Sequence, residues 1–124
     1  MPNINTVTGP LDTAKLGFTL PHEHLVDAGA GISDTYPELA DRERTLEHAI
    51  GDLTRAKAAG IDSIVEVSTL DLGRDVKLMR QVSERTGMQF ICATGAWLDI
   101  PRSFWGRTPD FIANLWSREI EQGI

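Results

Sequence analysis

Two histidines near the start of the chain, His22 and His24, are the residues whose types and spacing most directly suggest chemistry. On an extended strand successive side chains alternate between faces. Both imidazoles are therefore predicted to point the same way, and Glu23 the other way. Two neutral imidazoles on one face form half of a metal site, since catalytic zinc normally takes three protein ligands. The alternative is an ordinary pair of surface or core histidines, which is about as common for an isolated His-x-His motif.

The residues around the two histidines favour a metal site over an ordinary pair of surface histidines. Phe18, Leu20 and Leu25 make the predicted strand apolar, and Pro21 fixes φ just before the first histidine. Histidines exposed on a loop would not need this frame. The third histidine, His48, lies on a predicted helix beside its apolar stripe, and we expect it to be a surface or interface residue.

Predicted strands and helices alternate along the chain. The strands are expected at 4–8, 18–25, 61–67 and 88–94, and the helices at 42–59, at 73–85 and from an N-cap at Thr108 to a stop at Gly123. Gly9 and Pro10 are expected to close the first strand, and residues 12–17 to form a turn or one helical turn. Segments 27–41 and 95–107 are expected to be loops. The first of these either lines a site or is an ordinary surface excursion.

This alternation predicts a parallel sheet with right-handed crossovers. A doubly wound sheet and part of a (β/α)8 barrel both fit it. No glycine-rich phosphate-binding fingerprint follows the first core strand, which argues against dinucleotide binding. Chemically capable residues instead follow the strands, at the end where barrels build their sites: Glu66 and Asp71 after one, Trp97 and Asp99 after the next.

Length and composition limit the possible functions. The 124 residues suit one domain, 1–124, and the net charge of −6 argues against a nucleic-acid or anionic-membrane partner. The single cysteine, Cys92, allows no internal disulfide, and we expect a cytoplasmic location. No signal peptide and no membrane span are apparent in the sequence.

Five ordered segments of this sequence resemble the phosphotriesterase family of the amidohydrolase superfamily. They are INTV (4–7) with Gly9-Pro10, GFTLPHEH (17–24), IVEVST (64–69) with DLGRD (71–75), ATGAW (93–97) with Asp99, and REIEQGI (118–124). The resemblance implies a (β/α)8 TIM barrel, of which this chain would carry the first three βα units behind a short N-terminal strand or hairpin. It also implies a zinc-dependent hydrolase, of the aryldialkylphosphatase or lactonase kind, that hydrolyses small-molecule esters or organophosphates with a metal-bound hydroxide.

The same resemblance implies roles for individual residues. His22 and His24 would bind the more buried of two divalent metals, usually zinc. Trp97 would line the substrate pocket, although a core tryptophan beneath a loop is the alternative. The family commonly has aspartate at the position of Glu66, so a longer carboxylate there would change the hydrogen bonds around the metal ligands, unless it is only a solvated acid at a strand end. Glu66 and Asp99 could also add one oxygen ligand each. The family's full-length members are commonly dimers, which implies a homodimer.

The sequence also departs from the family. A (β/α)8 barrel takes about 250 residues, so we expect this chain to be a fragment of one. The other family ligands are a carboxylated lysine, two further histidines and an aspartate, all from later strands. We therefore expect the isolated chain to hydrolyse nothing. The alternative function is a non-catalytic barrel fragment that associates with itself or with a complementary C-terminal piece.

Overall fold

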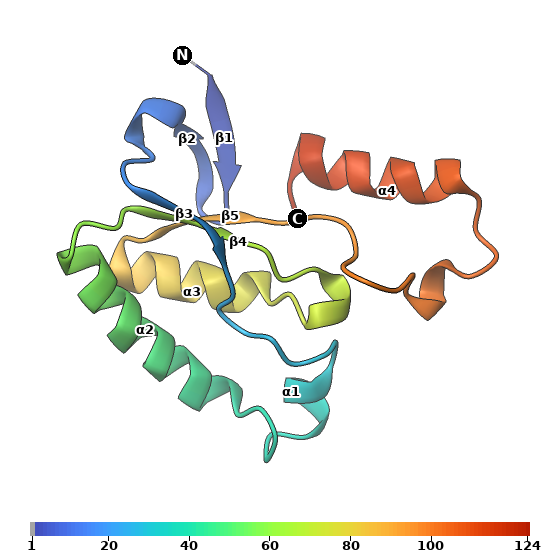
Figure 1. The fold of residues 1–124 in the computed structure, drawn as a ribbon, viewed down its shortest axis with the longest axis horizontal. Helices are drawn as coiled ribbons and strands as arrows, with labels where there is room; N and C mark the ends of the chain where they lie inside the picture. Colours follow the sequence, from blue (N-terminus) through green and yellow to red (C-terminus); the bar gives the residue numbers. More distant parts are fainter. Residues whose placement is uncertain (1) are drawn as a thin grey trace.

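A three-stranded parallel sheet is the centre of the fold in the computed structural model, which describes residues 2–124. Its strands are β3 (Thr19–Glu23), β4 (Ser63–Glu66) and β5 (Gln89–Cys92), in the order β3-β4-β5. Helix α2 (Arg42–Ala58) connects β3 to β4, and α3 (Val76–Thr86) connects β4 to β5. Both helices lie on one side of the sheet (Figure 1). This confirms the predicted alternation and parallel pairing, while closure into a barrel stays a prediction.

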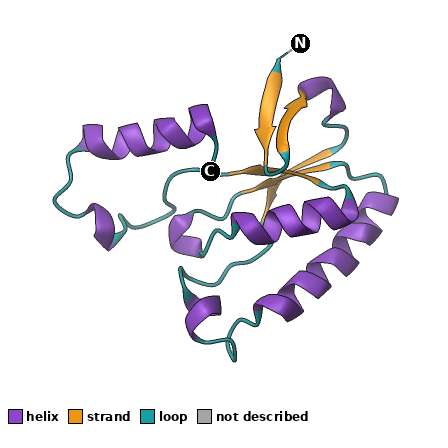
Figure 2. Cartoon of the chain, turned by 180° about the vertical axis from the view of Figure 1, so that it is seen from behind, coloured by secondary structure: helices purple, strands orange, loops and turns teal. Residues whose placement is uncertain are grey.

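An antiparallel hairpin precedes the sheet and lies on the opposite side from α2 and α3 (Figures 1 and 2). It consists of β1 (Asn3–Thr6) and β2 (Gly9–Asp12), and the short 3-10 helix η1 (Thr13–Lys15) follows. The predicted role of Gly9 and Pro10 as the stop of the first strand is wrong, because both residues belong to β2. The backbone of Val7 donates a hydrogen bond to the Phe90 carbonyl at 3.0 Å, which attaches the hairpin to β5.

The core lies between the sheet and the two helices. Its buried members are Ala49, Ile64, Met79, Val82, Met88 and Phe90. The predicted apolar stripe of α2 packs against this cluster through Leu46, Ile50, Leu53 and Ala56. Gly60 follows the helix with φ of +98°, a conformation that glycine adopts without strain, as the predicted stop requires.

Several predicted boundaries differ from those in the structure. The second helix begins at Val76 rather than at Gly73, which has φ of +81° and cannot belong to a right-handed helix. Asp75 caps this helix by accepting a hydrogen bond from the Leu78 backbone N–H at 2.8 Å. The predicted loop at 27–41 contains one helical turn, α1 (Ile32–Thr35). The strands predicted at 18–25, 61–67 and 88–94 are each three residues shorter in total, and the strand predicted at 4–8 is β1 at 3–6.

The last helix, α4 (Pro109–Gln122), begins as predicted. Thr108 accepts a hydrogen bond from the Phe111 backbone N–H at 3.2 Å, and Pro109 occupies the first turn. The loop between β5 and α4 contains one short 3-10 helix, η3 (Arg102–Phe104). Unlike α2 and α3, α4 lies to the side of the sheet (Figures 1 and 2), and none of its residues is buried.

Within residues 2–124, no helix is both long and apolar enough to cross a membrane.

Candidate metal-binding site

The two predicted metal ligands lie at the carboxyl end of the first parallel strand. His22 is in β3 and His24 follows it directly. Their ring centroids are 5.6 Å apart, with the ring planes inclined by 76°. Both residues are exposed, and the pairing of β3 with β4 is irregular between Leu20 and Glu23. The arrangement brings two imidazoles together on a solvent-accessible edge of the sheet.

A buried polar network lies directly behind His24. The His24 Nδ1 atom is 2.9 Å from the Ser68 hydroxyl oxygen, which is 2.6 Å from Glu66 Oε1. Glu66 also accepts hydrogen bonds from the backbone N–H groups of Leu25 at 2.9 Å and Ser68 at 3.0 Å. Glu66 and Ser68 are each 1 % exposed, so the interpretation of Glu66 as a solvated strand-end acid is wrong. The carboxylate connects the loop after β3 to the loop after β4.

A second acidic residue connects the next pair of loops. Asp71 lies in the 3-10 helix η2 (Leu70–Leu72), which follows β4. Its carboxylate accepts hydrogen bonds from the Trp97 backbone N–H at 3.1 and 3.3 Å and from the Thr69 hydroxyl at 2.5 Å. The Thr69 hydroxyl is the main cause that lowers the pKa of Asp71, and the Trp97 N–H adds to it. The three loops at the carboxyl ends of the sheet are thus joined in series.

A charged pair holds α4 against this end of the molecule. The Arg74 guanidinium donates to both oxygens of Glu119, at 2.8 and 3.0 Å, and to the Ala93 carbonyl at 2.8 Å. The Thr94 hydroxyl donates to the same carboxylate. The hydrogen bond from Arg74 is the main cause that lowers the pKa of Glu119, and in return it raises the pKa of Arg74. The bidentate pair orients α4 relative to the ends of β4 and β5.

Comparison with known proteins assigns this arrangement to a family. The model of the phosphotriesterase family matches residues 2–124. The chain belongs to the phosphotriesterase family. A phosphotriesterase homology protein of Mycobacterium tuberculosis is 35% identical over 134 aligned residues, which cover 100% of this chain. An aryldialkylphosphatase of Saccharolobus solfataricus is 32% identical over 116 residues and 92% of this chain, and an N-acetyltaurine hydrolase of Xenopus tropicalis is 29% identical over 149 residues and 97% of it.

The chain spans less than half the length of these phosphotriesterase-family relatives. The aligned region makes up 41%, 37% and 43% of the three relatives, in the order given above. Within residues 2–124 no group of three or more His, Cys, Asp or Glu side chains is arranged to hold a metal ion. The described part of this family member therefore contains the histidine pair with no third donor clustered beside it.

The remaining predicted site residues of this family member lie in the loop after β5. Trp97 is 67 % exposed, so it is not the core tryptophan that was the alternative. Its assignment to a substrate pocket stays a prediction, as does a role for Asp99, which is also exposed. His48 is exposed on α2, where a surface histidine was expected.

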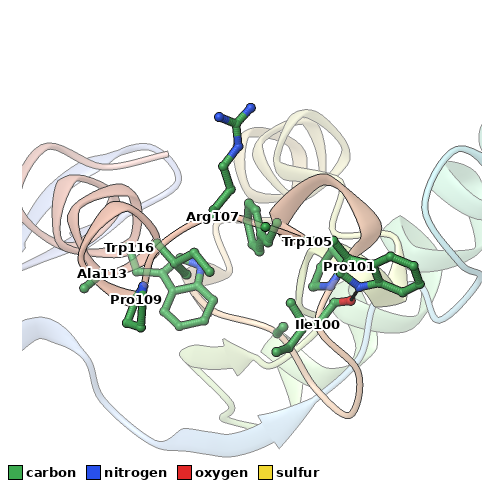
Figure 3. A pocket seen from close by; sticks show the side chains of 11 residues that line it. Ile100, Pro101, Trp105, Arg107, Pro109, Ala113 and Trp116 are labelled. Atoms are coloured by element: carbon green, nitrogen blue, oxygen red, sulfur yellow. Dashed lines mark hydrogen bonds between the residues drawn. The ribbon is translucent and has the colours of Figure 1, made fainter.

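One cavity in this phosphotriesterase-family chain lies away from the predicted ligands. It has a volume of about 580 Å³ and lies between the loop that carries η3 and α4. Figure 3 shows Ile100, Trp105 and Trp116 around it, and its lining is almost entirely apolar. Neither His22 nor His24 is among the lining residues.

The thiol of Cys92, at the carboxyl end of β5, is not a candidate nucleophile. Burial raises its pKa to about 11, so the neutral thiol predominates near pH 7.

Sequence reasoning missed two functional features of the site. It did not single out Ser68, and it did not pair Arg74 with Glu119. Ser68 follows Glu66 by two residues at a strand end, so the two side chains could have been expected on one face. No local signal pairs Arg74 with Glu119, because 45 positions separate them in the sequence.

Proposed function

We propose that this chain supplies two nitrogen ligands, from His22 and His24, to the metal centre of a hydrolase that acts on small-molecule esters. The observation that carries the proposal is the pair of exposed imidazoles, with ring centroids 5.6 Å apart, at the carboxyl end of a parallel strand. Parallel βα folds build their sites at this end. Family membership supports the reaction class.

The donor chemistry fits zinc in part. Neutral imidazole nitrogens are preferred zinc ligands, and zinc enzymes use three or more protein donors. Two donors are clustered within residues 2–124. A complete centre, with the two divalent metals that the resemblance implies, therefore requires donors beyond this pair. Zinc is our first choice, and other divalent metals suit imidazole as well.

The chain's own residues would orient the ligands and the substrate. A bound divalent metal lowers the pKa of water and polarises an ester oxygen. Glu66 already accepts three hydrogen bonds, so it suits the positioning of a ligand better than direct coordination. The Trp97 ring is exposed while its backbone N–H is held by Asp71, and we assign it to contact with the substrate. Asp99, two residues after Trp97, could offer a further oxygen ligand to the metal.

The relatives suggest which bond to test. One is named an aryldialkylphosphatase and another an N-acetyltaurine hydrolase, so the names include a phosphate ester and an amide. We propose an aryl dialkyl phosphate or a lactone as the substrate class, with an N-acyl amine as the third compound to assay.

The deciding experiment is equilibrium dialysis of the purified chain in a buffer that contains zinc. The zinc bound to the protein is the excess over the zinc in the buffer outside. The His22→Ala/His24→Ala double variant is compared with His48→Ala, which removes an exposed histidine remote in sequence from the pair. Because two imidazoles leave the site without the third donor that zinc usually takes, we expect weak zinc binding of at most one equivalent in the wild type and in His48→Ala, and none in the double variant. Equal zinc in all three proteins, or none in the wild type, would contradict metal binding by this pair in this chain.

A second candidate function is association without catalysis, through α4. Its apolar residues Phe111 and Ile120 are 44 % and 65 % exposed. Other apolar residues of the helix, Ile112, Ala113 and Trp116, line an apolar cavity. Such surfaces mark protein contacts. We propose a second copy of the chain as the partner, with a complementary C-terminal polypeptide as the competing one. Sedimentation equilibrium should give a dimer that the Phe111→Ser/Ile120→Ser variant converts to a monomer. A monomeric wild type would exclude the homodimer.

A further inference from the structure

The hydroxyl of Ser68 lies where it can decide which nitrogen of His24 carries the proton. We infer that Ser68 is a positioning residue that holds His24 in the Nδ1–H tautomer, so that Nε2 is the nitrogen left free to bind a metal. The consequence for metal binding rests on the proposed function, whereas the tautomer itself does not. The distances that carry the inference are 2.9 Å from Ser68 Oγ to His24 Nδ1, 2.6 Å to Glu66 Oε1 and 2.8 Å to the Val26 carbonyl.

A count of protons around Ser68 Oγ identifies the donor. The hydroxyl has one proton and two lone pairs. The Val26 carbonyl can only accept, and so can the Glu66 carboxylate, whose oxygens also receive the backbone N–H groups of Leu25 and Ser68. Ser68 therefore gives its proton to one of these two oxygens, of which Glu66 is the closer. A proton on His24 Nδ1 then lets the ring donate to Ser68 Oγ.

The opposite tautomer fits these neighbours less well. With the proton on Nε2, Nδ1 would be an acceptor, and three acceptors would surround one hydroxyl proton. Two of them would face the oxygen lone pairs, at a site where Ser68 and Glu66 are each 1 % exposed. Unsatisfied polar groups are costly where water cannot reach them. Packing and hydrogen bonding thus favour Nδ1–H at His24.

The backbone beside His24 and the backbone of Ser68 are both hydrogen-bonded to Glu66, which limits how the two side chains can rearrange. Glu66 receives the backbone N–H of Leu25, the residue next to His24, and the backbone N–H of Ser68 itself. Within residues 2–124 the ring of His22 makes no comparable hydrogen bond, although it lies beside the ring of His24. The two imidazoles are therefore held differently: one by a buried network, and the other without a hydrogen-bonding partner for its ring.

The inference is tested by nitrogen NMR of the histidine rings, at a pH where imidazoles are neutral. We expect His24 Nδ1 to show the shift of a protonated nitrogen and Nε2 that of an unprotonated one. Ser68→Ala should move His24 toward the Nε2–H form that free imidazole side chains prefer, and Ser68→Thr, which keeps a hydroxyl, should restore the wild-type pattern. Ser83→Ala is the matched control, because Ser83 is also buried and its hydroxyl bonds only to the Met88 carbonyl.

Zinc titration of the same four proteins gives the second readout. Loss of a hydrogen bond to a metal-binding histidine typically weakens metal affinity by about 10- to 100-fold. We expect that loss in Ser68→Ala and not in Ser68→Thr or Ser83→Ala. If the tautomer changes as expected but none of the proteins binds zinc, the tautomer inference stands and the proposed function fails.

Two results would overturn the inference. One is a wild-type spectrum in which His24 carries its proton on Nε2, which needs no variant and so does not depend on the folding of Ser68→Ala. The other is an unchanged His24 spectrum in a folded Ser68→Ala protein.

Discussion

Helices α3 and α4 have similar amphipathic sequences and opposite environments. In α3 the residues Met79 and Val82 belong to the core cluster with the sheet and α2, and Leu78 is buried too, whereas no residue of α4 is buried. We call the sheet with α2 and α3 the packed region, and α4 the outer helix. The comparison shows that an apolar stripe predicts a helix that needs a partner surface. Whether the same chain provides that surface has to be learned from the structure.

The largest expected difference between the two regions is the cost of removing an aromatic ring. Phe90→Ala in the packed region should lower the free energy of unfolding by about 3–5 kcal/mol, because Phe90 is fully buried and the change leaves a cavity. Phe111→Ala in the outer helix should cost below about 1 kcal/mol, since the ring is already partly exposed. Urea unfolding monitored by circular dichroism measures both. Equal losses would show that the outer helix is packed in solution.

The second prediction, with a smaller expected effect, compares the rate of thiol alkylation in the two regions. The pKa of Cys92 is raised to about 11 by burial, so at pH 8 its thiolate fraction is roughly a hundredfold below that of an ordinary exposed cysteine. A cysteine introduced by Ile120→Cys, in a Cys92→Ser background, should therefore react with iodoacetamide on the order of a hundred times faster than native Cys92. Similar rates would mean that β5 opens as readily as the outer helix.

The Arg74–Glu119 ion pair connects the outer helix to the rest of the chain. Its loss should destabilise the outer helix and leave the packed region unchanged. Arg74→Ala leaves Glu119 unpaired and should cost about 2 kcal/mol, less than a fully buried pair because Glu119 is partly exposed. Hydrogen exchange should accelerate across 109–122 and stay unchanged in α3. The control, Arg80→Ala, breaks an exposed pair with Glu84 and should change stability by below about 0.5 kcal/mol. Faster exchange in α3 as well would contradict a local role.

Low pH should weaken the Arg74–Glu119 ion pair, and this is the smallest of the four predicted effects. The folded-state pKa of Glu119 lies below its ordinary value of 4.5, mainly because of Arg74. The stabilisation is therefore fully present above pH 4.5 and is lost as the pH falls through the lowered value. We expect the urea midpoint of the wild type to exceed that of Glu119→Gln at pH 7, and the gap to narrow by pH 3. A constant gap would argue that the pair does not depend on ionisation.

The sequence predicted the elements of the packed region because their signals are local. The stripe of α2 and the alternation of strands with helices depend on neighbours within a few residues, and so does the cap at Thr108 that starts the outer helix. Strand ends were misplaced because hydrogen-bond pairing, rather than residue type, ends a strand. The predicted start of α3 is wrong because Gly73 adopts a left-handed backbone conformation and Asp75 caps the helix instead.

The sequence could predict the site only where the spacing of two residues on one strand determines the direction of their side chains. The i, i+2 spacing of His22 and His24 was enough to predict that the imidazoles share a side. The burial of Glu66 and the contact between His24 and Ser68 depend on how β3 and β4 align, across 44 positions of sequence. Single-sequence patterns do not encode such alignment, so the polar network behind the histidines became visible only in the folded chain.

The connections between the loops also bear on how this site can change in evolution. In both connections an acidic side chain accepts from a backbone N–H: Glu66 from Leu25, and Asp71 from Trp97. Every residue except proline carries that N–H, so the exposed side chain at position 97 can be exchanged without losing the hydrogen bond that holds its loop, whereas Leu25 also packs against the core. If position 97 contacts the substrate, as we propose, single substitutions there could create new contacts while the Asp71 hydrogen bond still holds the loop.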